Sequence, residues 1–304
     1  MRRAVAHLIS TSLVASALVA AAYTSTTPTE SGEQAAGSAD VVATDLTPVA
    51  AKKKKRMKVV QQNTDAKKTS FDAAVSKART AHAITLQEVC KSWVDGAKQP
   101  GWTVKFTATT EAKKCDNGTK LKGVAVIVPK KVKKVSFSKF KLKKDIGRTP
   151  KLLCVNYTRK GLRTHVCSTH LVAYNQPQDN GPKQNADKIR RKQVTQIRNK
   201  TRKWTSKGHL VVVGGDFNAV PKSRELDAMY AGQFTEVNQL NGKGGRQGEI
   251  TTDPGKDGNS RKIDYVFFSR NRVPISNWGK LTQVDHPVGG AGHWMMVARA
   301  AVRG

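Results

Sequence analysis

Acidic residues are scarce in this chain, which has 22 Asp and Glu against 54 Lys and Arg and a formal net charge of +32. Nearly all of this excess lies after residue 56. A field of that sign attracts polyanions such as DNA, RNA, acidic envelope polymers or anionic lipid surfaces. The alternative is that the charge serves solubility alone.

Internal repeats are also missing, so residues 57–304 are expected to form one domain.

Long hydrophobic runs are absent, with one partial exception at the N-terminus. Arg2 and Arg3 precede a mostly apolar stretch, 4–22, which ends in three alanines. This pattern is typical of a secretory signal peptide. The alternative is a membrane anchor, but the stretch is only marginally long enough and contains Ala, Ser and Thr rather than Leu. We therefore expect residues 1–22 to be a signal peptide and the protein to be secreted.

Residues 23–56 are rich in Thr, Ser, Ala and Pro and end in a run of basic residues, 52–56. Such a stretch has too little apolar surface to offset the entropy lost on ordering. We expect a disordered linker that carries a basic segment.

Cysteines are few, and none has the spacing of a zinc site. An even number in an exported chain predicts two disulfides. Residues 152–157 and 163–170 are expected to form a hairpin with a tight turn at 160–161. This register places Cys154 opposite Cys167 in a non-hydrogen-bonded pair, with Cα atoms about 4.5 Å apart. By elimination, Cys90 pairs with Cys115.

Short apolar runs dominate the remaining pattern. They predict strands at 57–63, 83–89, 102–109, 123–129, 132–138, 152–157, 163–170, 209–214, 264–268 and 294–302. Helices are expected at 70–81, with Thr69 or Ser70 as N-cap, and at 185–204, which is amphipathic. The basic face of the second helix is expected to be solvated, although it could touch phosphates. Many strands with few helices predict an α/β fold of two sheets packed face to face with helices outside.

The apolar run 211–213 leads through two glycines to Asp216 and Asn218. Residues two apart at a strand end can face the same side. A carboxylate and an amide there could hold a nucleophilic water or a phosphate oxygen. The alternative is an Asx turn that closes the strand.

Five more polar residues stand at or next to strand ends. Glu88 could bind a hard cation through oxygen, or could simply be exposed. His170 has a pKa suited to proton transfer, but a lone His is more often structural. Asp264 opens a strand and could orient a His, while His293 precedes the last strand. Asn63 ends the first strand and could add a neutral ligand to a metal or phosphate. Each signal is weak alone, but together these side chains could converge at one rim.

Taken in this order, the motifs resemble those of the endonuclease/exonuclease/phosphatase superfamily, which includes DNase I-like nucleases. The chain resembles a secreted, bacterial-type member of that superfamily. The motifs are residues 62–63, 87–88, 169–171, 215–218, 263–265 and 292–293. The resemblance covers 57–302 and implies a four-layer α/β sandwich of two mixed β-sheets flanked by helices.

The resemblance also implies roles for these residues. Glu88, with Asn63 nearby, would bind Mg²⁺, or Mn²⁺ or Ca²⁺. Asp216 and Asn218 would position the attacking water and the phosphate. His170 would contact the scissile phosphate or assist the leaving group. His293 would be the general base or an electrostatic partner, and Asp264 would support the histidines.

One departure concerns the last motif, where the family has Ser-Asp-His and this chain has Ala291-Gly292-His293. Losing an orienting carboxylate can cost orders of magnitude in rate. Asp285-His286 is a nearby alternative for the motif, and Asp285 could also fold back as a substitute partner. The terminal strand that follows His293 favours His293.

We therefore expect a monomeric, metal-dependent phosphodiester hydrolase, a nuclease with nucleic acid as its polyanionic partner. One alternative is a sphingomyelinase-like phospholipid phosphodiesterase, which aromatics at 6% and the lack of an apolar hairpin disfavour. The other is a catalytically weakened polyanion-binding protein, motivated by Gly292. No stable membrane insertion is expected after signal removal.

Overall fold

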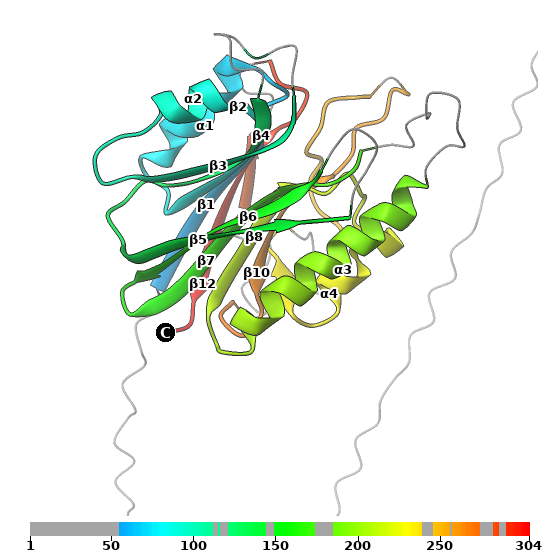
Figure 1. Ribbon diagram of the computed structural model, residues 1–304. Helices are drawn as coiled ribbons and strands as arrows, with labels where there is room; N and C mark the ends of the chain where they lie inside the picture. The colour runs from blue at the N-terminus through cyan, green and yellow to red at the C-terminus, as the bar shows by residue number, and fades with distance from the viewer. Residues whose placement is uncertain are drawn as a thin grey trace, which may run out of the picture. The chain divides into compact units, whose positions relative to one another are not determined.

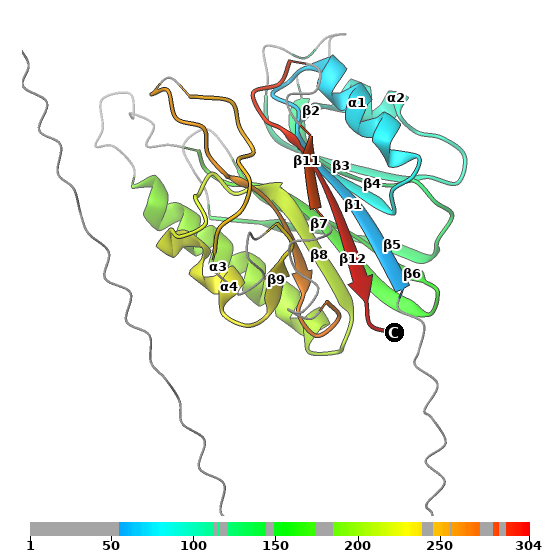
Figure 2. The ribbon, with the colours of Figure 1, turned by 180° about the vertical axis from the view of Figure 1, so that it is seen from behind.

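The computed structural model describes residues 55–111, 115, 121–143, 149–173, 185–238, 246–255, 257–273, 282–285 and 290–304. These residues form two six-stranded sheets with helices on their outer faces (Figures 1 and 2). The expected signal peptide and nearly all of the expected linker lie outside the described residues. Among the described residues, no helix has the length and hydrophobicity needed to cross a membrane.

The first sheet has the order β11-β12-β1-β2-β4-β3. Only β1 and β2 are parallel, and the remaining neighbours are antiparallel. The strands are β1 (Lys55–Asn63), β2 (Ala83–Cys90), β3 (Thr103–Glu111), β4 (Leu121–Val128), β11 (Thr282–Asp285) and β12 (Met295–Val302).

The second sheet has the order β5-β6-β7-β8-β10-β9 and is also mixed. Its single parallel pair is β7 with β8. The strands are β5 (Lys133–Lys141), β6 (Lys151–Arg159), β7 (Leu162–His170), β8 (Leu210–Asp216), β9 (Phe234–Glu236) and β10 (Asp264–Ser269).

Alternation along the strands builds three apolar layers. In β8, Leu210 and Val212 face the other sheet, while Val211 and Val213 pack against the helices outside. A third cluster joins the outer face of the first sheet to its own helices. Because side chains in a strand point alternately to its two faces, one apolar run supplies two interfaces. The predicted four-layer α/β sandwich is confirmed.

Two helices cover the first sheet: α1 (Lys68–Ala78) and α2 (Lys91–Gly96). The second sheet is covered by α3 (Ala186–Thr205) with a short 3-10 turn η1 (Arg224–Leu226) and α4 (Asp227–Tyr230). Asn185 caps α3, because its side-chain oxygen accepts a hydrogen bond from the Lys188 backbone N–H.

The N-cap expected for the first helix was wrong. The capping position is Lys67, which makes no side-chain capping bond, and Thr69 and Ser70 already lie in the first turn of α1. Ser70 is fully buried. Left-handed backbone at Asp65 and Ala66 turns the chain directly from β1 into the helix.

Every predicted strand is present, with ends that differ by a few residues. β1 begins at Lys55, inside the expected linker, because its pairing with β12 continues to Val302. The short strands β9 and β11 were missed. Cys154 lies directly opposite Cys167 with Cα atoms 4.0 Å apart. Both predicted disulfides are confirmed, including Cys90–Cys115.

Candidate active site

Strand directions bring the predicted site residues to one rim of the sandwich. β1 and β2 run parallel, as do β7 and β8, so their C-terminal ends carry Asn63, Glu88, His170 and Asp216. β10 and β12 run antiparallel to their neighbours and therefore begin at the same rim. In the second sheet Asp216 lies in register with His170 on one side and Asp264 on the other.

A bulge in β2 directs Glu88 into the site. The register with β4 shifts between Leu86 and Val89, and Glu88 has a φ of 55°. Regular alternation would have placed Glu88 beside Leu86, on the face that α1 and α2 cover. Its carboxylate instead lies between the sheets, with Oε1 4.0 Å from His170 Nδ1 and Oε2 2.5 Å from Lys122 Nζ.

Asp216 is fully buried and serves two purposes at once. Its Oδ1 accepts a hydrogen bond of 2.8 Å from the Asn218 backbone N–H, which is the Asx turn considered as an alternative. Its Oδ2 accepts a 3.0 Å bond from Asn63 Nδ2 and lies 3.5 Å from His170 Nε2. The turn therefore fixes one oxygen and leaves the other among the site residues.

His293 and Asp264 form a hydrogen-bonded pair. His293 Nδ1 donates to Asp264 Oδ2 over 2.9 Å, and its Nε2 faces Asp216 Oδ2 at 3.9 Å. The hydroxyl of Thr251 donates to the same Asp264 oxygen over 3.0 Å, and Gln61 Nε2 donates to the other over 3.3 Å. This network fixes the orientation of the imidazole.

Charge inside the site shifts the pKa values of its groups. Burial would raise the pKa of Glu88, but His170 and Lys122 outweigh it and lower the value to about 2. Burial would lower the pKa of His293, but Asp264, then Asp216 and Glu88, raise it to about 10. Burial, followed by the charge of Asp264, raises the pKa of Asp216. Glu88 is therefore ionised at neutral pH and available as a cation ligand.

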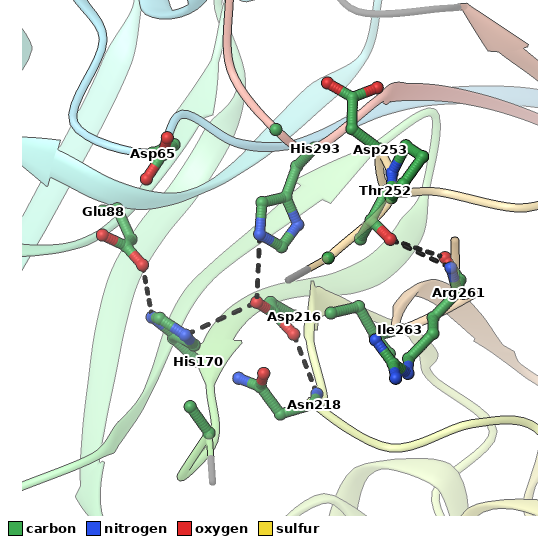
Figure 3. A pocket seen from close by; sticks show the side chains of 14 residues that line it. Asp65, Glu88, His170, Asp216, Asn218, Thr252, Asp253, Arg261, Ile263 and His293 are labelled. Carbon is green, nitrogen blue, oxygen red and sulfur yellow. Dashed lines mark hydrogen bonds and ion pairs between the residues drawn. The ribbon is translucent and has the colours of Figure 1, made fainter. Parts of the chain in front are cut away.

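These side chains surround an open cavity of about 570 Å³ (Figure 3). Its polar lining comes from both sheets and from the loop before β10: Asp65, Glu88, His170, Asp216, Asn218, Thr252, Asp253, Arg261 and His293. Carboxylate oxygens are the ligands preferred by Mg²⁺, Mn²⁺ and Ca²⁺. The composition of the cavity therefore fits a hard divalent cation.

Asp216, Asp264 and His293 each place one potential ligand atom within 4.8 Å of the others. Asp264 already accepts hydrogen bonds from His293, Thr251 and Gln61. Its lone pairs are thus engaged in orienting the imidazole. Glu88 and Asp216 are the carboxylates of the predicted set that face the cavity.

Asn63 is placed in the site with its amide nitrogen inward. Its Oδ1 accepts a 3.1 Å bond from the Asp65 backbone N–H, while Nδ2 approaches Asp216 and, at 3.4 Å, His293 Nε2. Its expected role as a metal ligand stays a prediction, as do the catalytic roles of the other site residues.

Asp65, Asp253 and Thr251 are among the site residues that the sequence analysis missed. Asp65 lines the cavity on the side of Glu88, and its spacing from Asn63 repeats that of Asn218 from Asp216 (Figure 3). That repeated spacing was the available signal. Asp253 also lines the cavity, and Thr251 supports Asp264. Both come from the loop before β10, where no strand pattern indicated them.

Gly292, where the family motif has Asp, lies at open space: a Cβ added there would meet no atom within 4 Å. The neighbouring Asp253 donates its backbone N–H to Gly292 O over 2.9 Å, and its carboxylate accepts a 2.7 Å bond from the Trp294 indole. Asp285 ends β11, where its backbone pairs with Met295 of β12, and His286 lies outside the described residues.

The chain belongs to the endonuclease/exonuclease/phosphatase family, whose sequence profile matches residues 58–285. Members of this family are hydrolytic phosphoesterases and are usually metal-dependent. Among curated proteins no significant match was found.

Solved structures show the same fold at low sequence identity. The human Nocturnin catalytic domain with bound sulfate superposes with a TM-score of 0.57 and 14% identity, over 82% of this chain and 94% of that one. Truncated Caenorhabditis elegans TDP2 superposes with a TM-score of 0.57 and 16% identity, over 81% of this chain and 97% of that one. ANGEL2, a 2′,3′-cyclic phosphatase, in complex with adenosine-2′,3′-vanadate superposes with a TM-score of 0.55 and 12% identity, over 81% of this chain and 96% of that one.

Proposed function

We propose that this protein is a secreted, divalent-metal-dependent nuclease that hydrolyses phosphodiester bonds of DNA or RNA. The observation that carries the proposal is the meeting of Glu88, Asp216 and the His293–Asp264 pair around one open cavity. Phosphodiester hydrolysis needs neutralisation of phosphate charge, a positioned water and a group near the leaving oxygen. The cavity supplies a residue for each need.

In this proposal Asp216 and Asn218 hold the attacking water and a phosphate oxygen, which their position in the lining of the cavity supports. His293, held by Asp264, points its Nε2 toward the same place. His170 lies on the other side of Asp216, near Glu88, and is suited to contact the phosphate or the leaving oxygen. A divalent cation, when held by Glu88, supplies positive charge next to the phosphate.

Charge supports a polynucleotide substrate. The chain carries a net charge of +32, and phosphate contacts from Lys and Arg dominate the affinity of such proteins for nucleic acid. The signal-like residues 1–22 and the two disulfides support secretion, because disulfides persist in oxidising compartments.

A catalytically weakened polyanion-binding protein remains the second candidate, and Gly292 is its motivation. The 2.9 Å bond from His293 to Asp264 favours catalysis, because the histidine keeps an orienting carboxylate although the motif lacks its Asp. The experiment below separates the two candidates.

Supercoiled plasmid, RNA and sphingomyelin vesicles are incubated with the purified protein in Mg²⁺ or in EDTA, beside Glu88→Gln and His293→Gln. We expect Mg²⁺-dependent cleavage of a nucleic acid that both substitutions abolish. Retardation of plasmid without cleavage would favour the binding protein. Release of phosphocholine from the vesicles would favour a lipid phosphodiesterase.

A further inference from the structure

The open edge of the sandwich combines exposed apolar side chains with lysines. β3 is an edge strand of the first sheet and β5 is an edge strand of the second, and side chains of both strands line one groove. A groove of about 350 Å³ runs along this edge, lined by Lys98, Trp102, Thr103, Val104, Lys105 and Val135. Site residues of the catalytic cavity are not part of its lining.

Phe137 is the most exposed large apolar side chain in the described part of the chain, at 58%. It lies opposite Val155, whose side chain belongs to the apolar layer between the sheets. Residues directly opposite each other share a face, so Phe137 faces β3. Lys105 of β3 places its Nζ 4.7 Å from the centre of the Phe137 ring.

Lysines continue from Phe137 toward the catalytic rim. Lys139 and Lys141 follow on the same face of β5, and Lys141 lies directly opposite Lys151 of β6. Burial and the positive charges of Lys139 and Lys141 lower the pKa of Lys151. Among the described residues, no ion pair involves any of these three lysines. Like charges set opposite each other destabilise a sheet, so the cluster is costly unless an anion neutralises it.

Lys139, Lys141 and Lys151, here called the lysine row, lead toward the active site. A second hollow, beside the catalytic cavity, is lined by Thr109 of β3, by Pro150 and by Lys122, together with Glu88 and His170. Pro150 immediately precedes Lys151, and Lys151 Nζ bonds to the carbonyl of Ala108 in β3. Phe137 and the three lysines therefore lie along one edge of the sandwich, and Lys151, at the near end, adjoins the hollow that Glu88 and His170 line.

We propose that this edge is a binding track for a single strand of nucleic acid, in which Phe137 stacks on an unpaired base and Lys139, Lys141 and Lys151 contact the phosphates leading to the catalytic cavity. The proposal rests on the proposed nuclease function and adds the strandedness of the substrate. Aromatic platforms beside basic grooves bind single strands without sequence preference. In a duplex the bases are already stacked and out of reach of the ring.

Protection of the sheet edge is the competing explanation for the lysines, because charged residues on edge strands prevent aggregation. It does not account for Phe137 and Val135, which are 58% and 43% exposed on the same strand, nor for Lys151, which lies on an inner strand. An anionic membrane fits less well, because Phe137 lies within a strand and faces β3 instead of standing at the tip of a projecting loop.

Binding is measured by fluorescence anisotropy of a labelled single-stranded DNA of mixed sequence, in EDTA to prevent cleavage. Phe137→Ser is expected to weaken binding about tenfold, the usual loss for one stacked base. Lys139→Gln/Lys141→Gln should lower the slope of log K against log salt by roughly 1.4, for two lost phosphate contacts. Arg79→Gln/Lys207→Gln is the matched control: it removes the same charge at the opposite end of the molecule and should leave this binding unchanged.

Substrate length provides a second readout. A strand rises about 3.3 Å per residue, so Phe137 lies roughly 13 Å beyond Lys141. Dinucleotides held in the catalytic cavity cannot reach the ring, and their affinity should not depend on it. Thermal unfolding of each variant is compared with that of the unaltered protein, because a loss of folding would also weaken binding.

The track is refuted if Phe137→Ser and the double lysine variant bind single-stranded DNA as tightly as the unaltered protein does. It is equally refuted if they lose only duplex binding, binding to phosphatidylserine vesicles, or self-association. Failure of the proposed function looks different. In that case the unaltered protein cleaves no nucleic acid, even though the variants lose single-strand binding as expected. If the unaltered protein cleaves nucleic acid and the variants bind single-stranded DNA normally, the nuclease function is supported and the binding track is refuted.

Discussion

Replacing Asp264 with Asn tests the orientation of His293, on which the proposed chemistry depends. Asp264 is 1% exposed and accepts hydrogen bonds from His293 Nδ1 at 2.9 Å, Thr251 Oγ1 at 3.0 Å and Gln61 Nε2 at 3.3 Å. Asparagine has the same size, but it carries no charge, and its nitrogen cannot accept a hydrogen bond. One of the three donors is therefore left without an acceptor or forced to reorient.

The expected effect is on kcat, because Asp264 does not line the cavity and acts through His293. Substitutions of carboxylates that orient a catalytic or metal-bound His reduce activity by roughly 10- to 10⁴-fold. Because Asp264 is buried and accepts three hydrogen bonds, we expect Asp264→Asn to lower kcat by roughly 10²- to 10⁴-fold. This corresponds to about 3–5 kcal/mol of activation free energy. KM for plasmid or RNA should change much less.

Thr251→Val is the matched control, because it removes one donor to the same Asp264 oxygen and keeps the carboxylate charge. It also removes the acceptor of the Ile263 and Asp264 backbone N–H groups, a loss that should lower the free energy of unfolding. Its kcat should fall only about tenfold, the scale of one lost hydrogen bond to Asp264. Initial rates of plasmid cleavage at saturating Mg²⁺ measure both variants, and their unfolding transitions show that they are folded. A folded Asp264→Asn variant whose kcat stays within a factor of about ten of the unaltered protein would refute the orienting role.

Three further predictions concern the stability of the fold. Gly214→Ala should lower the free energy of unfolding by about 1–3 kcal/mol, measured by urea titration, because the new Cβ would lie 2.1 Å from the Thr85 hydroxyl of the facing sheet. An unchanged urea midpoint would contradict this close packing. Breaking the Cys154–Cys167 disulfide by double substitution with Ala should cost about 3 kcal/mol, the value for a loop of this size; a loss below about 1 kcal/mol would show that the hairpin needs no crosslink. Burial, then the positive charges of His209 and Arg163, lower the pKa of His165 from 6.5 to about 3. The unfolded chain therefore binds a proton that the folded protein does not, and stability should fall as the pH drops from about 6.5 toward 3, by at most about 1.4 kcal/mol per pH unit from this group. Replacing His165 with Gln should flatten the decline in unfolding free energy over this range, and an identical slope in both proteins would contradict the assignment.

The parts of the fold set by local patterns could be predicted from the sequence. Alternation located the strands that carry the site, and the count of residues around the 160–161 turn gave the Cys154–Cys167 pair. The convergence of Asn63, Glu88 and His170 followed from their positions at strand ends. Period-two alternation and tight turns are short-range signals, so a sequence records them directly.

The details that aim the side chains could not be predicted. The direction of Glu88 depends on a bulge whose register is visible only once β4 is paired with β2. Asp65 and Asp253 lie in irregular segments, and Thr251 reaches Asp264 from a loop more than ten residues away in the sequence. Contacts of this kind are decided by the packed structure, because no local periodicity encodes where a loop folds back.

The most direct test of the account is a crystal structure of the protein soaked with Mn²⁺, with the metal located by anomalous scattering. The account predicts an anomalous peak in the cavity between the two sheets, within bonding distance of a carboxylate oxygen of Glu88, and its loss in Glu88→Gln. A cavity without a peak at saturating Mn²⁺, or a peak bound elsewhere that Glu88→Gln leaves unchanged, would contradict the claim that these strand ends assemble a cation-dependent hydrolytic site.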